Sequence, residues 1–102
     1  MAEFVEAARL HQVAQGTGTT VTVAGKDLAL FNVDGLVYAM DDACLHAGGS
    51  LGSGQLEGKI VTCPAHGWKY DVTTGSTMNV PDYGVSCYPV KIVDGKVLIA
   101  VS

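Results

Sequence analysis

Cys44-Leu45-His46 and Cys63-Pro64-Ala65-His66 stand in the middle of a 102-residue chain, and the rest of the sequence is organised around them. Each segment supplies one potential thiolate and one imidazole, and sixteen residues separate His46 from Cys63. Two thiolates and two imidazoles are a suitable ligand set for a tetrahedral zinc ion or for an iron–sulfur cluster. The pattern predicts one metal centre between two loops, with Cys44, His46, Cys63 and His66 as its ligands.

The order of the ligands bears on which metal is bound. Structural zinc sites group their cysteines as C-x₂₋₄-C and their histidines as H-x₃₋₅-H, whereas each pair in this chain mixes the two residue types. Mixed pairs suit a cluster with two unlike irons, one held by both thiolates and the other by both imidazoles. A 2Fe–2S cluster is therefore the favoured interpretation, and a structural zinc domain is the alternative.

The sequence on either side of the two pairs has the pattern of antiparallel strands. Asp34-Gly35 and Asp94-Gly95 are hairpin signals, Gly25-Lys26-Asp27 is a predicted turn, and the opening segment Glu3–Val13 fits either a strand or a helical turn. Runs rich in β-branched and apolar residues predict strands at Thr19–Val23, Leu28–Val33, Leu36–Met40, Tyr88–Val93 and Lys96–Val101.

The stretch between these hairpins, residues 41–83, is rich in glycine. Only Gln55-Leu56, Lys59–Thr62 and Trp68–Val72 in it resemble short strands. A segment with so little apolar periodicity needs an internal fastener to stay folded, and this is where the cysteine and histidine pairs lie.

Composition limits the class of protein. Hydrophobic residues make up 48% of the chain and the formal net charge is −4, which argues against disorder and against a nucleic-acid partner. The odd count of three cysteines argues against a complete disulfide framework. With no basic, apolar leader at the start and no apolar run approaching about 20 residues, we expect no membrane span and a cytoplasmic location.

The two pairs and their surroundings resemble the Rieske 2Fe–2S signature. The likeness runs through Cys44–Gly49 and Cys63–Asp71, then Thr74-Gly75, Val80-Pro81 and Tyr88-Pro89-Val90. It implies an all-β Rieske iron–sulfur fold of stacked antiparallel sheets, with a cluster-binding subdomain at about 41–83 inserted into a single domain, 1–102. It also implies one 2Fe–2S cluster, in which Cys44 and Cys63 bind the inner iron while His46 and His66 bind the outer iron at an exposed tip.

Departures from the respiratory Rieske proteins indicate a low reduction potential. Those proteins carry a disulfide between the ligand loops and a serine after the second His-Gly, whereas this chain has Ala65 and Trp68 at the corresponding positions. Tyr70 does match a tyrosine that bonds a ligand thiolate in the family. Fewer donors to the sulfurs stabilise the reduced state less, which predicts a potential near the low end of the Rieske range, about −150 mV.

These features resemble the soluble Rieske-type ferredoxins of bacterial ring-hydroxylating oxygenase systems, which serve in aromatic hydrocarbon catabolism. The resemblance implies a one-electron carrier between an NAD(P)H-dependent flavoprotein ferredoxin reductase and a terminal oxygenase, monomeric and not an enzyme alone. The alternative is an enzyme subunit, either the Rieske-like small subunit of an assimilatory nitrite reductase or a truncated oxygenase domain.

Three residues outside the ligand set also carry expectations. His11 has no cysteine near it in the sequence and is expected to be a surface histidine. Cys87 lies in a strand pattern and is expected to be a small buried hydrophobe. Trp68 is expected to pack beneath the second ligand loop rather than to lie at a partner surface.

Overall fold

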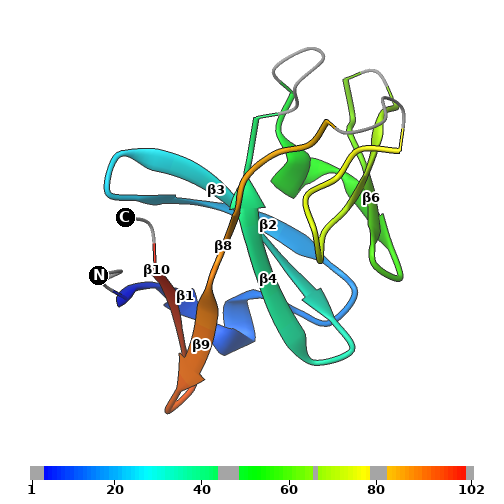
Figure 1. Ribbon diagram of the computed structural model, residues 1–102. Coiled ribbons are helices and arrows are strands. Elements are labelled where there is room, and N and C mark those ends of the chain that lie inside the picture. Colours follow the sequence, from blue (N-terminus) through cyan, green and yellow to red (C-terminus); the bar gives the residue numbers. More distant parts are fainter. Residues whose placement is uncertain (1–3, 44–48, 66, 79–82, 101–102) are drawn as a thin grey trace.

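The computed structural model describes residues 4–43, 49–65, 67–78 and 83–100. These residues contain strands and two short 3₁₀ helices but no α-helix, which confirms the all-β prediction (Figure 1). Neither 3₁₀ helix is long and apolar enough to cross a membrane. The 3₁₀ turns are η1 (Leu10–Gln12) and η2 (Leu51–Ser53). The strands are β1 (Phe4–Arg9), β2 (Gly18–Val23), β3 (Lys26–Val33), β4 (Leu36–Asp41), β5 (Gln55–Glu57), β6 (Ile60–Thr62), β7 (Lys69–Asp71), β8 (Cys87–Tyr88), β9 (Val90–Val93) and β10 (Lys96–Ala100).

The strands form three antiparallel sheets. Their orders are β1-β10-β9, β2-β3-β4-β8 and β5-β6-β7. The small β5-β6-β7 sheet lies at the opposite end of the molecule from β1 and β10 (Figure 1). Pro89, which has no backbone N–H, separates β8 from β9 at the point where the chain leaves the second sheet and enters the first.

The β2-β3-β4-β8 sheet is the middle layer, because β3 is buried on both faces. Leu28 and Leu30 pack with residues of β10, whereas Ala29 and Phe31 pack with residues of β6 and β7. Alternate residues of a strand point to opposite faces of its sheet. The stacked arrangement therefore has two cores, one on each side of β3, and the core that contains Ala29 and Phe31 also includes Cys63, one of the predicted metal ligands.

Three hairpins turn through residues with positive φ. The predicted Asp34-Gly35 and Asp94-Gly95 turns are confirmed. The φ values are 53° and 89° in the first turn, and 52° and 76° in the second. The turn predicted at Gly25-Lys26-Asp27 is one residue too late. It is formed by Ala24 and Gly25, with φ of 52° and 80°, and β3 already begins at Lys26. Alanine is not a usual first residue of such a turn, so the pattern gave no signal for it.

Candidate metal centre

The second cysteine–histidine pair lies in a tight connection between β6 and β7. Cys63 follows β6 directly and is 1% exposed. Its backbone N–H donates to the carbonyl of Trp68 (2.7 Å), and the N–H of Gly67 donates to the carbonyl of Cys63 (2.9 Å). Gly67 has a φ of 79°, a conformation that favours glycine. These bonds hold a turn in which Cys63 is buried, while Pro64, Ala65 and Gly67 are exposed.

The first pair lies in the segment between β4 and η2. Its base is closed by an antiparallel bridge between Ala43 and Ser50, and by a 2.7 Å bond from the N–H of Leu51 to the carbonyl of Asp42. Three of the four predicted ligands, Cys44, His46 and His66, lie outside the described residues, as does Pro81. Cys63 is the predicted ligand that the structure describes.

Gly49 brings the two ligand loops together. A Cβ on Gly49 would lie 3.0 Å from the sulfur of Cys63 and 2.9 Å from the Cβ of Ala65. The backbone that ends the first motif therefore lies directly against the residues that begin the second, at a distance that only glycine permits. A buried cysteine sulfur with a glycine backbone pressed against it suits a thiolate ligand of an iron–sulfur cluster, since backbone groups close to the sulfur tune such a site.

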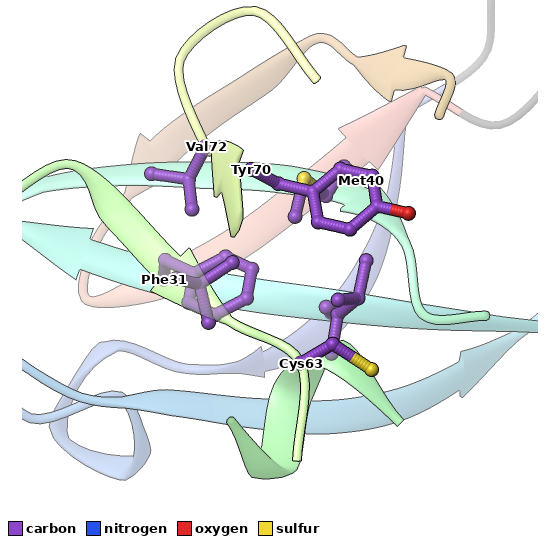
Figure 2. Close-up of a cluster of buried hydrophobic side chains, with 8 residues drawn as sticks. Phe31, Met40, Cys63, Tyr70 and Val72 are labelled. Atoms are coloured by element: carbon purple, nitrogen blue, oxygen red, sulfur yellow. The ribbon is translucent and has the colours of Figure 1, made fainter. Parts of the chain in front are cut away.

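The floor of this site is apolar. Cys63 belongs to a buried cluster with Phe31, Met40 and Tyr70, and Trp68 packs against that cluster. Figure 2 shows the sulfur of Cys63 and the hydroxyl of Tyr70 pointing to the same side of the cluster. The expected packing role of Trp68 is confirmed. A dry floor on one side and an exposed loop on the other would shield a redox group while leaving one face accessible.

Two carboxylates, Asp41 at the end of β4 and Asp71 at the end of β7, have strong local partners. Burial opposes the charge of Asp71, but hydrogen bonds from the hydroxyl and N–H of Thr73 and the nearby Lys59 outweigh it and lower its pKa. The carboxylate of Asp41 accepts a 2.6 Å bond from the hydroxyl of Tyr88. Partial burial, this bond and the charge of Asp41 raise the pKa of Tyr88 to about 12.

Cys87 and His11 lie outside the ligand loops, and both are exposed. The expectation for His11 is confirmed, whereas the expectation that Cys87 is buried is wrong. Cys87 is in the short edge strand β8, where its side chain lies beside Gly75. Partial burial and the charges of Asp71 and Asp41 raise the pKa of its thiol, so it is a poor nucleophile at neutral pH.

Sequence reasoning missed the part played by Asp42. It was one of several acidic residues with no distinguishing pattern, yet its side chain is buried and accepts hydrogen bonds from Thr20, Ser50 and Gly52. Thr20 is 22 positions away in the chain, so no local signal could have revealed this network.

Comparison with known proteins places these features in a family. A family model for the Rieske [2Fe-2S] domain matches residues 3–89. The ferredoxin component of a naphthalene 1,2-dioxygenase system from Pseudomonas putida is 39% identical over 101 residues, spanning 98% of this chain and 97% of that protein.

Solved structures give the same result. A ferredoxin from Sphingomonas yanoikuyae B1 superposes with a TM-score of 0.89 at 32% identity, covering 98% of this chain and 100% of that one. A chain from a complex of reduced oxygenase and oxidized ferredoxin of carbazole 1,9a-dioxygenase has a TM-score of 0.86 at 29% identity, covering 95% and 92%. A putative nitrite reductase small subunit from Mycobacterium tuberculosis has a TM-score of 0.90 at 23% identity, covering 100% and 97%, which shows the shared fold alone.

Proposed function

Because the chain belongs to the Rieske [2Fe-2S] domain family, we propose that it is the ferredoxin of an aromatic-ring-hydroxylating oxygenase system. The observation that carries this proposal is the 39% identity to such a component over almost the full length of both proteins. The chain would form a single domain, 1–102, with a cluster-binding subdomain at about 41–83. The β5-β6-β7 sheet, which lies within those bounds, supports this division.

The cluster that the family implies is a Rieske-type 2Fe–2S cluster, which accepts and releases one electron. Cys44 and Cys63 are its proposed thiolate ligands, and His46 and His66 its proposed imidazole ligands. Support comes from the contact between Gly49 and Cys63, which brings the two ligand loops to one place. The choice of cysteine and histidine from each loop is the donor set of a Rieske centre.

The residues around this site suit electron transfer better than catalysis on a substrate. Cys63 and Tyr70 are buried, so one side of the site excludes water. Pro64, Ala65 and Gly67 are exposed, so the second ligand loop lies at the surface where a partner can approach. A carrier needs this short path to solvent and has no need of a substrate pocket. The protein would therefore catalyse nothing alone.

The partners follow from this role. An NAD(P)H-dependent flavoprotein ferredoxin reductase would deliver one electron to the protein, and a terminal oxygenase would take that electron to hydroxylate an aromatic ring. The oxygenase partner is supported by the similarity to a chain from an oxygenase–ferredoxin complex. Exchange between two partners suits a monomer in the cytoplasm. The nitrite reductase alternative has weaker support, because its likeness lies below 25% identity.

Reconstitution tests this function. The purified protein is mixed with NADH and with the reductase and oxygenase of a naphthalene 1,2-dioxygenase system, and naphthalene dihydrodiol is measured. We expect product that depends on this protein, and none with Cys63→Ser, which replaces a thiolate ligand. A protein that the reductase reduces but that supports no turnover with this or other ring-hydroxylating oxygenases would contradict the proposal.

A further inference from the structure

The carboxylate of Asp42 is buried at the base of the first ligand loop. Its residue is 7% exposed, and its Oδ1 accepts three hydrogen bonds. The hydroxyl of Thr20 and the hydroxyl of Ser50 each donate from 3.0 Å, and the backbone N–H of Gly52 donates from 2.8 Å. Burying a carboxylate destabilises the folded protein unless hydrogen-bond donors compensate for the lost hydration. The position of Asp42 therefore calls for an explanation.

The three donors come from separate parts of the chain. Thr20 is in β2, Ser50 closes the loop through its bridge with Ala43, and Gly52 is in η2. The carbonyl of Asp42 also accepts from the N–H of Leu51. Asp42 therefore ties both ends of segment 43–50 to each other and to the middle sheet.

Close packing makes this tie rigid. A Cβ on Gly52 would lie 2.8 Å from the carbonyl of Thr19, so η2 lies against β2 with no room for a side chain between them. Ser53 extends the network, because its hydroxyl donates to the hydroxyl of Ser50 at 3.3 Å. These bonds fasten Ser50, the residue that follows Gly49, to the end of β4 and to the middle sheet.

We propose that Asp42 is a positioning residue for the cluster, through its three hydrogen bonds and its fixed negative charge. The hydrogen bonds hold Gly49 against Cys63 and so fix the loop that carries Cys44 and His46. The charge sits on a residue that is 7% exposed and lies two positions before the proposed ligand Cys44, where it disfavours the added electron and keeps the reduction potential low. This inference rests on the ligand set given under the proposed function.

The competing explanation is that Asp42 supports folding and nothing else. Three variants separate the two explanations. Asp42→Ala removes the hydrogen bonds and the charge, whereas Asp42→Asn removes the charge but keeps a carbonyl oxygen to accept the same donors. Asp27→Asn is the matched control, because it removes the same charge from an exposed carboxylate that accepts a hydrogen bond from Thr22 of the adjoining strand.

The experiment measures two properties of the purified, cluster-loaded proteins. One is the rate at which visible absorbance is lost in the presence of an iron chelator, and the other is the reduction potential from protein-film voltammetry. We expect Asp42→Ala to lose the cluster about tenfold faster, because removing a residue that orients metal ligands usually weakens metal binding by at least about that factor. We expect Asp42→Asn to have a higher potential than both the wild type and Asp27→Asn.

Either of two results overturns the proposal. One is a wild-type rate of cluster loss in Asp42→Ala, and the other is a potential of Asp42→Asn no higher than that of Asp27→Asn. If Asp42→Ala does not fold, Thr20→Val replaces it, because it removes one donor from the same oxygen; a wild-type loss rate in that variant also overturns the proposal. A wild-type protein that binds no cluster would instead overturn the proposed ligand set.

Discussion

A Cβ on Gly49 would stand 3.0 Å from the sulfur of Cys63. Real Cβ atoms are rarely found so close to a neighbouring atom. The same Cβ position would also lie 2.9 Å from the Cβ of Ala65. Fourteen positions separate Gly49 from Cys63 in the sequence. Their closeness supports the proposal that the two cysteine–histidine pairs form one site.

Gly49→Ala should therefore disrupt cluster binding. The added methyl must push the second ligand loop away, and overpacking of this kind costs about 1–3 kcal/mol. We expect the variant to purify with less than a full complement of iron and sulfide while its circular dichroism stays that of a β protein.

Gly58→Ala is the control for this substitution. Gly58 has a φ of 60° and nothing within 4 Å of its Cβ position, so alanine there costs about 1–2 kcal/mol of backbone strain without touching the site. It should lower the free energy of unfolding but retain the cluster. Full iron content in Gly49→Ala would show that the loops need not lie so close.

The Tyr88–Asp41 hydrogen bond predicts a loss of stability in alkali. Because the pKa of Tyr88 is raised from 10.0 to about 12, the unfolded chain loses this proton before the folded protein does. The contribution of this hydrogen bond to the free energy of unfolding is fully present below pH 10 and is lost as the pH rises toward 12. Tyr88→Phe should therefore show a smaller fall in the free energy of unfolding across this range, measured by urea unfolding.

Tyr83→Phe is the matched control, since Tyr83 is 62% exposed. It should follow the wild-type profile. Difference titration of tyrosinate absorbance between the wild type and Tyr88→Phe should show one group with a pKa of about 12. A titration of that group near the ordinary tyrosine value would mean that the bond to Asp41 is not formed in solution.

Asp71 predicts the opposite dependence at acid pH. Because its pKa is lowered in the folded protein, Asp71 contributes to the free energy of unfolding above the pKa that it has in the unfolded chain. That contribution is lost as the pH falls through its pKa in the folded protein. Asp71→Asn keeps an acceptor for Thr73 but removes the 3.3 Å ion pair with Lys59, at a cost of up to about 1 kcal/mol at neutral pH.

The measurement for Asp71 is the free energy of unfolding from neutral to acid pH. The gap between wild type and Asp71→Asn should narrow as the solution is acidified. Asp34→Asn is the control. Asp34 is exposed in a hairpin turn with a left-handed backbone, a conformation that asparagine also adopts, so this variant should have the same dependence of unfolding free energy on pH as the wild type. A gap that stays constant with pH would remove Asp71 as the source of the dependence.

The reduction potential is expected near the low end of the Rieske range, about −150 mV. At the two positions on which this expectation rests, Ala65 is exposed and Trp68 packs against the buried cluster around Cys63. Neither residue offers a hydroxyl or a disulfide to the site. Protein-film voltammetry measures the potential, and a value above zero would contradict the account.

Local patterns in the sequence predicted most strands and two of the hairpins, but they left β1 undecided between a strand and a helical turn. The single strand expected at Tyr88–Val93 is divided at Pro89 into β8 and β9, which belong to different sheets. Asp34-Gly35 and Asp94-Gly95 adopt positive φ readily, and the structure has both turns. Ala24-Gly25 was misplaced by one residue, because its turn is imposed by the pairing of β2 with β3 rather than by its own residue types. Cys87 was wrongly expected to be buried, since exposure of a strand residue depends on which sheet edge it occupies.

The ligand set could be predicted because its residue types and spacing are unusual, whereas the residues that support it could not. Thr20, Asp42 and Ser50 are common polar residues, and they meet only because β2, β4 and η2 pack together. Burial on both faces of β3 likewise depends on a third sheet that lies far along the chain. Such relationships belong to the tertiary structure.

The nitrogen hyperfine couplings of the reduced protein, measured by electron–nuclear double resonance, test the central claim most directly. We predict a paramagnetic 2Fe–2S centre with couplings from two histidine nitrogens, one of His46 and one of His66, each lost when that histidine is replaced. A protein with no paramagnetic signal after reduction, as a zinc site would give, would contradict the account. So would a signal that shows no coupling to histidine nitrogen.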